Sequence, residues 1–248
     1  MSTRPCIVVT GASRGIGAAI SVRLAEAGFT VACLSRSGAL PTLGGVAAPA
    51  SELLVPMACD ITRTGAMVEA LAELTRRGLQ IGGLINNAGV HLDAPAASAS
   101  LAHYEEVMST NATSVFLACQ AVYPYLAERK NGLIVNMGSF FEKLGVKRNL
   151  AYCASKAAVG AMTRCLAVEW AGDGIRVLAI APGYIHTDLN HEAMTAGPLR
   201  AYLDKRIPGK QPGTADEVAR LVTALFTMDV PFLSGETITI DGAQGVAH

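Results

Sequence analysis

Short apolar runs alternate with longer segments of helical period along the whole chain. The apolar runs, rich in valine and isoleucine, are CIVVT (6–10), TVACLS (30–35), a run ending just before Asp60, GGLINN (82–87), GLIVNMGS (132–139), IRVLAIAP (175–182) and ETITID (236–241). The segments of helical period are 16–27, 63–77, 101–128, 150–171 and 215–228. Parallel strands need crossover connections, and crossover helices cover both faces of their sheet. The alternation therefore predicts an α/β fold: one doubly wound, Rossmann-like parallel sheet of about seven strands, with helices on both faces.

Two segments interrupt this alternation. Residues 35–54 hold prolines and paired glycines where a crossover helix would stand, so we expect that helix to be short or absent. Residues 182–213 are long for a connection and are bounded by glycine and proline. We interpret them as a substrate lid, within 184–213, that contains a short helix. No internal repeat or long polar linker divides the chain, which predicts a single domain over 1–248.

Composition and charge narrow the possible partners. The 248 residues are 51% hydrophobic, and 20 Lys and Arg residues balance 20 Asp and Glu residues. A chain of this length can bury a sizeable core, and scattered, balanced charges give no broad positive field for nucleic acid. The first apolar run is too short, and is interrupted too soon by Arg14, to be a signal peptide or a membrane anchor. We therefore expect a cytoplasmic protein that binds neither nucleic acid nor membrane.

Cysteine and histidine give no metal or disulfide pattern. The six cysteines show no C-x-x-C spacing, and most lie in apolar segments where a reduced thiol behaves as a small hydrophobe. His186, Asp188 and His191 form the one local group of conceivable ligands, but neither their spacing nor a further ligand supports a site. The sequence predicts no metal and no disulfide.

A glycine-rich turn follows the first apolar run. The sequence TGASRGIGAAI places Gly11, Gly15 and Gly17 between a strand and a helix. A backbone without Cβ can approach a pyrophosphate closely, and the N–H groups and dipole of the helix stabilise its charge. A tight strand-to-helix turn without a ligand is the alternative, but the order of strand, turn and helix favours a dinucleotide. The spacing is G-x-x-x-G-x-G rather than the commoner G-x-G-x-x-G.

The end of the second strand indicates which dinucleotide binds. An acidic side chain there would bind the ribose hydroxyls of NAD, but this chain has Ser35 and Arg36, and Arg14 lies in the glycine turn. Arginine offers planar, multidentate contacts to phosphate, so these residues predict NADPH, with NAD the less favoured cofactor. The alternative is that both arginines are solvated surface residues. Asp60 suits the adenine amino group as an acceptor, or caps the next helix, and the two roles are compatible.

Five motifs then occur in one order. TGASRGIG (10–17), NNAG (86–89), Ser139, YCASK (152–156) and PGYIHT (182–187) together resemble the classical short-chain dehydrogenase/reductase family over essentially the whole chain. The resemblance implies an NAD(P)-dependent oxidoreductase acting on CH–OH and carbonyl groups. It also implies a catalytic set, matched here by Asn111, Ser139, Tyr152 and Lys156. Tyr152 follows Ser139 by thirteen residues, as the family pattern requires.

Physical chemistry agrees with these roles. Residues four apart share one helix face, so the Lys156 ammonium is expected near the Tyr152 phenol, where it would lower the phenol pKa. Tyr152 would then give a proton to a carbonyl oxygen, or take one from an alcohol, while Ser139 holds the same oxygen. Taken alone, a tyrosine and a lysine at this spacing form an ordinary structural pair, and Ser139 with the glycine turn makes the catalytic interpretation the stronger one.

Further contacts follow from the resemblance. Lys156 would bind the nicotinamide ribose, and Asn111 would hold a water that relays protons to it; a solvated surface asparagine is the alternative. Asn111 in mid-helix would also disturb the helical hydrogen bonds. Ile185 and Thr187 match the positions that contact the nicotinamide carboxamide. The full set of expected cofactor contacts is Gly11, Ser13, Arg14, Gly15, Ile16, Gly17, Ser35, Arg36, Asp60, Ile61, Asn87, Ala88, Gly89, Tyr152, Lys156, Pro182, Gly183, Ile185 and Thr187.

Substrate specificity is expected in the segment after Ser139 and in the lid. These segments offer the side chains of Phe140, Phe141, Glu142, Val146, Tyr184, His191, Met194 and Leu199. Their apolar character favours a carbonyl flanked by carbon, although Glu142 or His191 could bind hydroxyls. The expected substrate contacts are Ser139, Phe141, Tyr152 and Tyr184.

Three functions remain open. The chain is similar to 3-oxoacyl-[acyl-carrier-protein] reductases, which implies reduction of a 3-oxoacyl thioester or a similar ketone. An NADP-linked sugar or polyol dehydrogenase would share every catalytic residue. A catalytically silent NADPH-binding regulator is the third possibility, and the intact catalytic set argues against it. Four cations could meet an acyl carrier protein, or be solvated loop ends: Arg129, Lys130, Lys147 and Arg148.

A homotetramer is expected. Segment 150–171 is apolar on more than one side, which indicates that it is buried by more than the sheet. By resemblance, it and segment 101–128 pair with their copies in a neighbouring subunit, and the C-terminal strand and tail meet a second neighbour, which gives closed dihedral symmetry. Unusually tight packing within one chain is the alternative.

Overall fold

The computed structural model describes residues 4–43, 46–47, 52–187, 194 and 197–247. Its centre is a seven-stranded sheet in which every paired neighbour is parallel, in the order β11-β8-β7-β6-β1-β2-β5. The strands are β1 (Cys6–Thr10), β2 (Val31–Ser35), β5 (Leu54–Ala58), β6 (Ile81–Asn86), β7 (Gly132–Met137), β8 (Ile175–Pro182) and β11 (Thr237–Ile240). The predicted doubly wound parallel sheet is confirmed.

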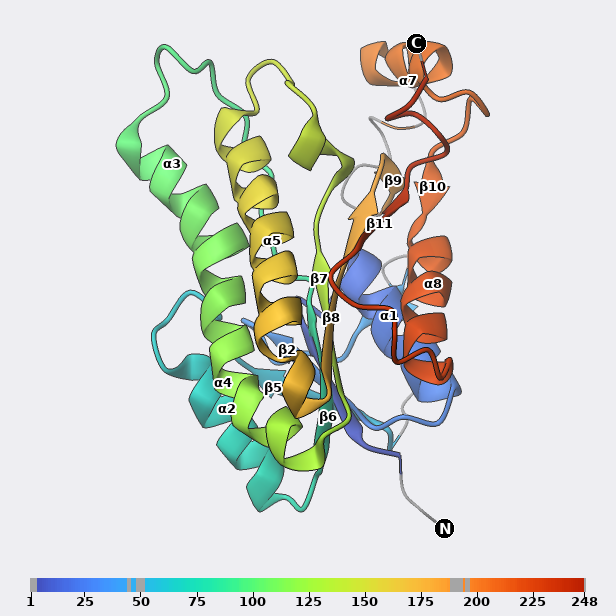
Figure 1. Cartoon of the computed structure of the whole chain (residues 1–248). Coiled ribbons are helices and arrows are strands. Elements are labelled where there is room, and N and C mark those ends of the chain that lie inside the picture. Colours follow the sequence, from blue (N-terminus) through green and yellow to red (C-terminus); the bar gives the residue numbers. More distant parts are fainter. Residues whose placement is uncertain (1–3, 44–45, 48–51, 188–193, 195–196, 248) are drawn as a thin grey trace.

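Helices cover both faces of this sheet (Figure 1). One face carries α1 (Gly15–Glu26) and α8 (Ala215–Thr227), and the other carries α2 (Ala66–Arg76), α4 (Ser114–Arg129) and α5 (Leu150–Glu169). Side chains alternate between the two layers along β1: Val8 belongs to the core under α2, α4 and α5, whereas Ile7 and Val9 belong to the core under α1 and α8. Burial on both faces explains the continuously apolar strand sequences.

The helix expected over 101–128 is interrupted in the structure. It consists of α3 (Leu101–Met108), a π-helical turn (Ser109–Thr113) and α4, so one hydrogen-bond register gives way to another in mid-helix. The hydrophobic periodicity of 101–128 did not reveal this turn. Asn111 lies in the π turn, so the predicted disturbance of the helix at this residue is confirmed.

The two irregular segments of the sequence are also irregular in the fold. Between β2 and β5, the described residues form a short antiparallel pair, β3 (Thr42–Leu43) and β4 (Val46–Ala47), and no helix. The segment predicted as a lid contains α7 (Pro198–Arg206), and β9 (Ile185–His186) pairs with β10 (Gly213–Thr214). Asp188 and His191 lie outside the described residues. No helix of the described chain is long and apolar enough to cross a membrane.

The carboxyl ends of β1, β6, β7 and β8 lie at one edge of the sheet. Strand order reverses between β1 and β6, because β2 and β5 extend to one side of β1 and β6, β7 and β8 to the other. In open α/β sheets, a crevice that binds ligands forms outside such a switch point. Short helical turns (Phe140–Lys143 after β7, Ala171–Asp173 before β8) complete the connections.

Candidate active site

The glycine turn packs closely against the segment that follows β6, with no room for a Cβ at Gly11 or Gly17. Gly11 and Gly15 have positive φ values of 66° and 58°, a conformation that favours glycine. A Cβ on Gly17 would lie 2.3 Å from the carbonyl oxygen of Gly11 and 2.4 Å from Nδ2 of Asn87. Helix α1 begins directly at Gly15 and has no side-chain cap, so its N-terminal N–H groups remain available to a ligand.

Hydrogen bonds clamp this turn to the NNAG segment. The Thr10 hydroxyl accepts from the backbone N–H groups of Asn87 (3.0 Å) and Ala88 (3.1 Å). The Asn87 amide donates to the carbonyls of Thr10 and Gly11, each at 3.1 Å. Hydrogen bonds therefore join the segments that follow β1 and β6 at the switch point, where the sequence predicted a dinucleotide.

The end of β2 carries the residues expected at the adenosine. Ser35 is buried, and its hydroxyl accepts from the backbone N–H of Gly38 at 3.1 Å, so it shapes the turn after the strand. Arg14 and Arg36 are exposed. The Arg36 charge contributes to lowering the pKa of Asp60, so these two side chains face one region of space.

Asp60 does not cap the next helix. Its Oδ1 accepts from the backbone N–H (3.0 Å) and the hydroxyl (2.7 Å) of Thr62, and these bonds are the largest cause of its lowered pKa. Helix α2 begins only at Ala66, after Gly65, and has no side-chain cap. The capping alternative is therefore wrong, because the carboxylate accepts its hydrogen bonds from Thr62, in the turn that precedes the helix.

Tyr152 and Lys156 lie on one face of α5, and the Lys156 ammonium is 5.6 Å from the centre of the Tyr152 ring. The Lys156 Nζ donates to the carbonyl oxygen of Met137 at 2.7 Å. Burial lowers the pKa of Lys156 to about 8, because a charged ammonium is poorly solvated there.

The pKa of Tyr152 differs from the prediction. Burial raises it, and the Ser139 hydroxyl acts in the opposite direction. The predicted lowering by Lys156 is therefore wrong for the protein as described, because desolvation of the phenol outweighs its neighbours and the ammonium is bonded to Met137. Ser139 itself is buried, and its Oγ accepts from the backbone N–H of Phe141 at 3.2 Å.

Asn111 is fully buried and bonded on both sides of its amide. Its Oδ1 accepts from the Val90 N–H at 2.8 Å, and its Nδ2 donates to the Val90 carbonyl at 2.8 Å and to the Ser155 hydroxyl at 3.2 Å. Its exposed fraction is 0%. The alternative of a solvated surface asparagine is therefore wrong.

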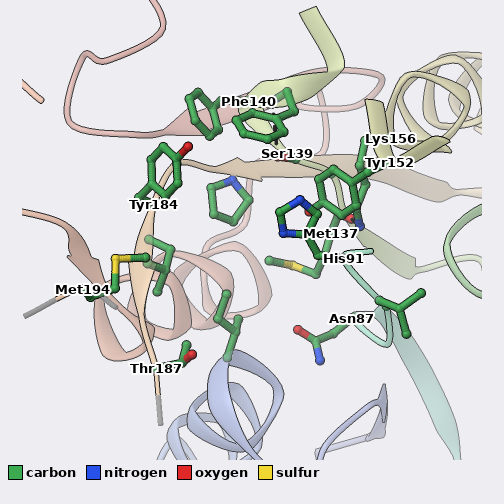
Figure 2. Close-up of a pocket in the computed structure, with 18 residues that line it drawn as sticks. Asn87, His91, Met137, Ser139, Phe140, Tyr152, Lys156, Tyr184, Thr187 and Met194 are labelled. Atoms are coloured by element: carbon green, nitrogen blue, oxygen red, sulfur yellow. Dashed lines mark hydrogen bonds between the residues drawn. The ribbon is translucent and has the colours of Figure 1, made fainter. Parts of the chain in front are cut away.

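A cavity of about 290 Å³ lies at this edge of the sheet (Figure 2). It brings together all four expected substrate contacts, Ser139, Phe141, Tyr152 and Tyr184. Among the expected cofactor contacts, it is also lined by Ile16, Asn87, Gly89, Lys156, Pro182, Gly183, Ile185 and Thr187. Of the specificity side chains, Phe140 and Met194 line it, whereas Glu142, Val146 and Leu199 do not.

His91 is a cavity residue that the sequence analysis missed. Its ring centre lies 4.5 Å from that of Tyr152, and its Nε2 pairs with Oδ1 of Asn149. Figure 2 shows His91 beside Tyr152 at the cavity. Its position two residues after the NNAG motif was the signal available, because that motif ends at the same sheet edge. Met137, at the end of β7, was missed as well.

Comparison with known proteins identifies the family. A family model described as Enoyl-(Acyl carrier protein) reductase matches residues 11–244. D-threitol dehydrogenase from Mycolicibacterium smegmatis is 35% identical, over 96% of this chain and 92% of its own. The 3-oxoacyl-[acyl-carrier-protein] reductase MabA of Mycobacterium tuberculosis is 33% identical, over 98% of this chain and 93% of its own. The chain belongs to the short-chain dehydrogenase/reductase family.

A solved structure agrees with this assignment. A gluconate 5-dehydrogenase from Burkholderia cenocepacia J2315, in complex with NADP and tartrate, matches this short-chain dehydrogenase/reductase with a TM-score of 0.86 and 27% identity. The match covers 100% of this chain and 97% of that one. The predicted enzyme class, an oxidoreductase acting on CH–OH and carbonyl groups, is confirmed by the family.

Proposed function

We propose that this protein is an NADPH-dependent reductase of ketones with apolar flanks, in which Tyr152 is the proton donor. One observation carries the proposal: Tyr152, Lys156 and Ser139 line a cavity that also reaches Ile16 in the glycine turn and Asn87 beside it. A cofactor at the turn and a carbonyl at Tyr152 would therefore share one space.

The glycine turn fits a dinucleotide. The positions where a Cβ would collide, Gly11 and Gly17, are those where backbone must approach a pyrophosphate. The exposed Arg14 and Arg36 would hold the 2′-phosphate of NADPH, and the gluconate 5-dehydrogenase with bound NADP supports this cofactor. NADPH, when bound, supplies the hydride.

The raised pKa of Tyr152 suits a proton donor in ketone reduction, because the phenol stays protonated at neutral pH. Ser139 would hold the carbonyl oxygen and stabilise the charge that develops on it. Lys156 would bind the cofactor ribose and return a proton to Tyr152. Asn111 would help to position Tyr152 and Lys156 through its hydrogen bonds to Val90 and Ser155.

The cavity wall supports an apolar substrate. Phe141 lies edge-on to both Tyr152 and Tyr184, with ring centres 6.0 and 6.1 Å apart, and Met137 and Met194 add thioethers. Aromatic and methionine side chains of this kind favour hydrocarbon next to the reacting carbonyl. A 3-oxoacyl thioester or a similar ketone satisfies this description, and MabA supports it.

A sugar or polyol dehydrogenase is the second candidate. The similarity to D-threitol dehydrogenase favours it. Of the two side chains that could bind substrate hydroxyls, Glu142 does not line the cavity, and His191 lies outside the described residues. The ketone reductase is therefore the stronger proposal.

Steady-state assays decide between the candidates. NADPH consumption is measured with an acetoacetyl thioester, an alicyclic ketone and an aldose, and NADP reduction is measured with threitol. We expect kcat/KM at least tenfold higher for the ketones than for the aldose or threitol. The reverse order would establish the second candidate, and tight NADPH binding without turnover of any of them would revive the regulatory function.

The homotetramer, the acyl carrier protein and the cytoplasmic location remain proposals. Exposed apolar side chains on α4 and α5 support assembly: Phe116 is 48% exposed, Leu150 55% and Val168 82%. Light scattering is expected to give four times the mass of one 25.7 kDa chain. A monomer would refute the tetramer, and a dimer would leave only one of its two interfaces.

A further inference from the structure

Glu142 has a buried carboxylate oxygen for which no other residue of the described chain provides a hydrogen bond. The residue belongs to the short helical turn that follows Ser139, and its Oε2 is buried without a hydrogen-bond partner in the described residues. Burying such an oxygen is costly, so its presence calls for a compensating role.

Two glycines make room for this carboxylate. A Cβ on Gly138 or on Gly160 would each lie 3.2 Å from Oε2 of Glu142, so the oxygen fits between the end of β7 and the middle of α5. Gly138 lines the cavity and Glu142 does not. The carboxylate therefore lies on the segment that carries the Met137 carbonyl and the Ser139 hydroxyl, but outside the cavity.

Lys156 is the proposed active-site residue that bonds to the same segment. It is 6% exposed, and its ammonium donates to the carbonyl of Met137, the residue before Gly138. Burial lowers the pKa of this lysine, and the negative charge of Glu142 is the effect that raises it. A positive charge needs such a partner when water is excluded.

We propose that Glu142 is a positioning residue of the active site, a carboxylate that holds Lys156 in its charged form from outside the cavity. Without this charge, Lys156 would lose its proton at a lower pH and could no longer bind the ribose and recharge Tyr152 as an ammonium. The catalytic role of Lys156 in this inference rests on the proposed function. The electrostatic coupling between Glu142 and Lys156 does not.

Other charges around Glu142 act on its ionisation. Burial raises the pKa of the Glu142 carboxyl, and the negative charge of Glu236 adds to this effect. Lys143 on the same turn, the Thr237 hydroxyl on β11 and Arg164 on α5 act in the opposite direction and favour the carboxylate. Lys143 and Arg164 thus favour the ionised form of Glu142 on which the inference depends.

The coupling can be measured in the protein without cofactor. Lysine labelled with ¹³C at Cε reports the titration of Lys156 by NMR, and loss of the signal in Lys156→Arg assigns it. In Glu142→Gln, we expect the midpoint to fall by roughly half a unit to one and a half units. Glu142→Asp, which keeps the charge, should restore most of the shift. Glu105→Gln, an exposed charge on α3, should leave the midpoint unchanged.

A midpoint that is equal in wild type and Glu142→Gln would overturn the inference. Circular dichroism checks that each variant folds. Should Glu142→Gln fail to fold, reciprocity offers a second measurement: Lys156→Met must raise the carboxyl pKa of Glu142, and an unchanged value would again overturn the inference.

The pH profile of catalysis then separates this inference from the proposed function. With wild type, kcat/KM for ketone reduction should fall as pH rises through about 8, where Lys156 loses its proton. In Glu142→Gln, this alkaline limb should move down by the same shift as the NMR midpoint. If no ketone is reduced, the proposed function fails while the NMR titration still decides the coupling; if ketones are reduced and the midpoint does not move, only the inference fails.

Discussion

The two ends of the active-site edge are built by different means. At the nucleotide end, glycines and backbone carbonyls form the surface, and the charged side chains Arg14 and Arg36 are exposed. At the catalytic end, the polar side chains are buried: Asn111 is 0%, Ser139 6% and Lys156 6% exposed. A change at the nucleotide end should therefore act by filling space or removing a screened charge. A change at the catalytic end should act by removing a buried partner.

The largest effect is expected from Tyr152→Phe at the catalytic end. It removes only the proton donor, so kcat should fall by about 100-fold or more while NADPH affinity changes little. Stopped-flow rates and cofactor titration measure the two quantities. A rate above roughly a tenth of wild type would assign the general acid to another group. Lys156→Ala is the contrasting variant, because it should weaken both the rate and cofactor binding.

Gly17→Ala tests the nucleotide end. The new methyl group would lie 2.3 Å from the Gly11 carbonyl oxygen, which is backbone and cannot move without opening the turn. We expect a loss of about 1 to 3 kcal/mol in the free energy of unfolding and at least tenfold weaker NADPH binding. Gly172→Ala is the matched control, since a Cβ there meets nothing within 4 Å. Equal effects of the two changes would contradict the steric explanation.

Asn111→Ala should leave the Val90 N–H and carbonyl without their partner. Buried backbone groups that lose a hydrogen bond cost about 1 to 3 kcal/mol, so urea denaturation should show a loss of this size. Asn111→Asp keeps the acceptor for the Val90 N–H but sets a second acceptor against the Val90 carbonyl inside the protein, so its loss should be at least as large. The exposed Asn131 provides the control, and a loss as large in Asn131→Ala would show that burial is not the cause.

The sequence predicted the backbone-built end better than the buried one. The bounds of β1 and β8 match the apolar runs, because strands that are buried on both faces consist mostly of apolar residues. The glycine turn was found because its chemistry requires glycine at fixed positions. The proposed catalytic set comes from spacing and family motifs, and the cavity brings three of its members together.

What the sequence could not predict depends on contacts distant along the chain. The Asn111 side chain bonds to Val90 and Ser155, and no local pattern links these residues to it. The direction of the Tyr152 pKa depends on burial by His91 and Phe141, which meet it only in the fold. Glu142 looks like a substrate ligand by position, yet it packs against Gly138 and Gly160.

The smallest effect is expected from Arg36→Ala at the nucleotide end. Arg36 is exposed, so its contact with a 2′-phosphate would be screened by solvent and salt, and its loss should weaken NADPH binding by roughly 1 kcal/mol, about fivefold. NADH has no 2′-phosphate and serves as the internal control, so its dissociation constant should stay the same. Raising the ionic strength should shrink the difference between wild type and variant for NADPH alone. An equal loss for both cofactors would mean that Arg36 supports the turn after β2 and does not bind the phosphate. Arg36 would then act as a structural residue, and the explanation of the nucleotide end by screened charges would be wrong for this residue.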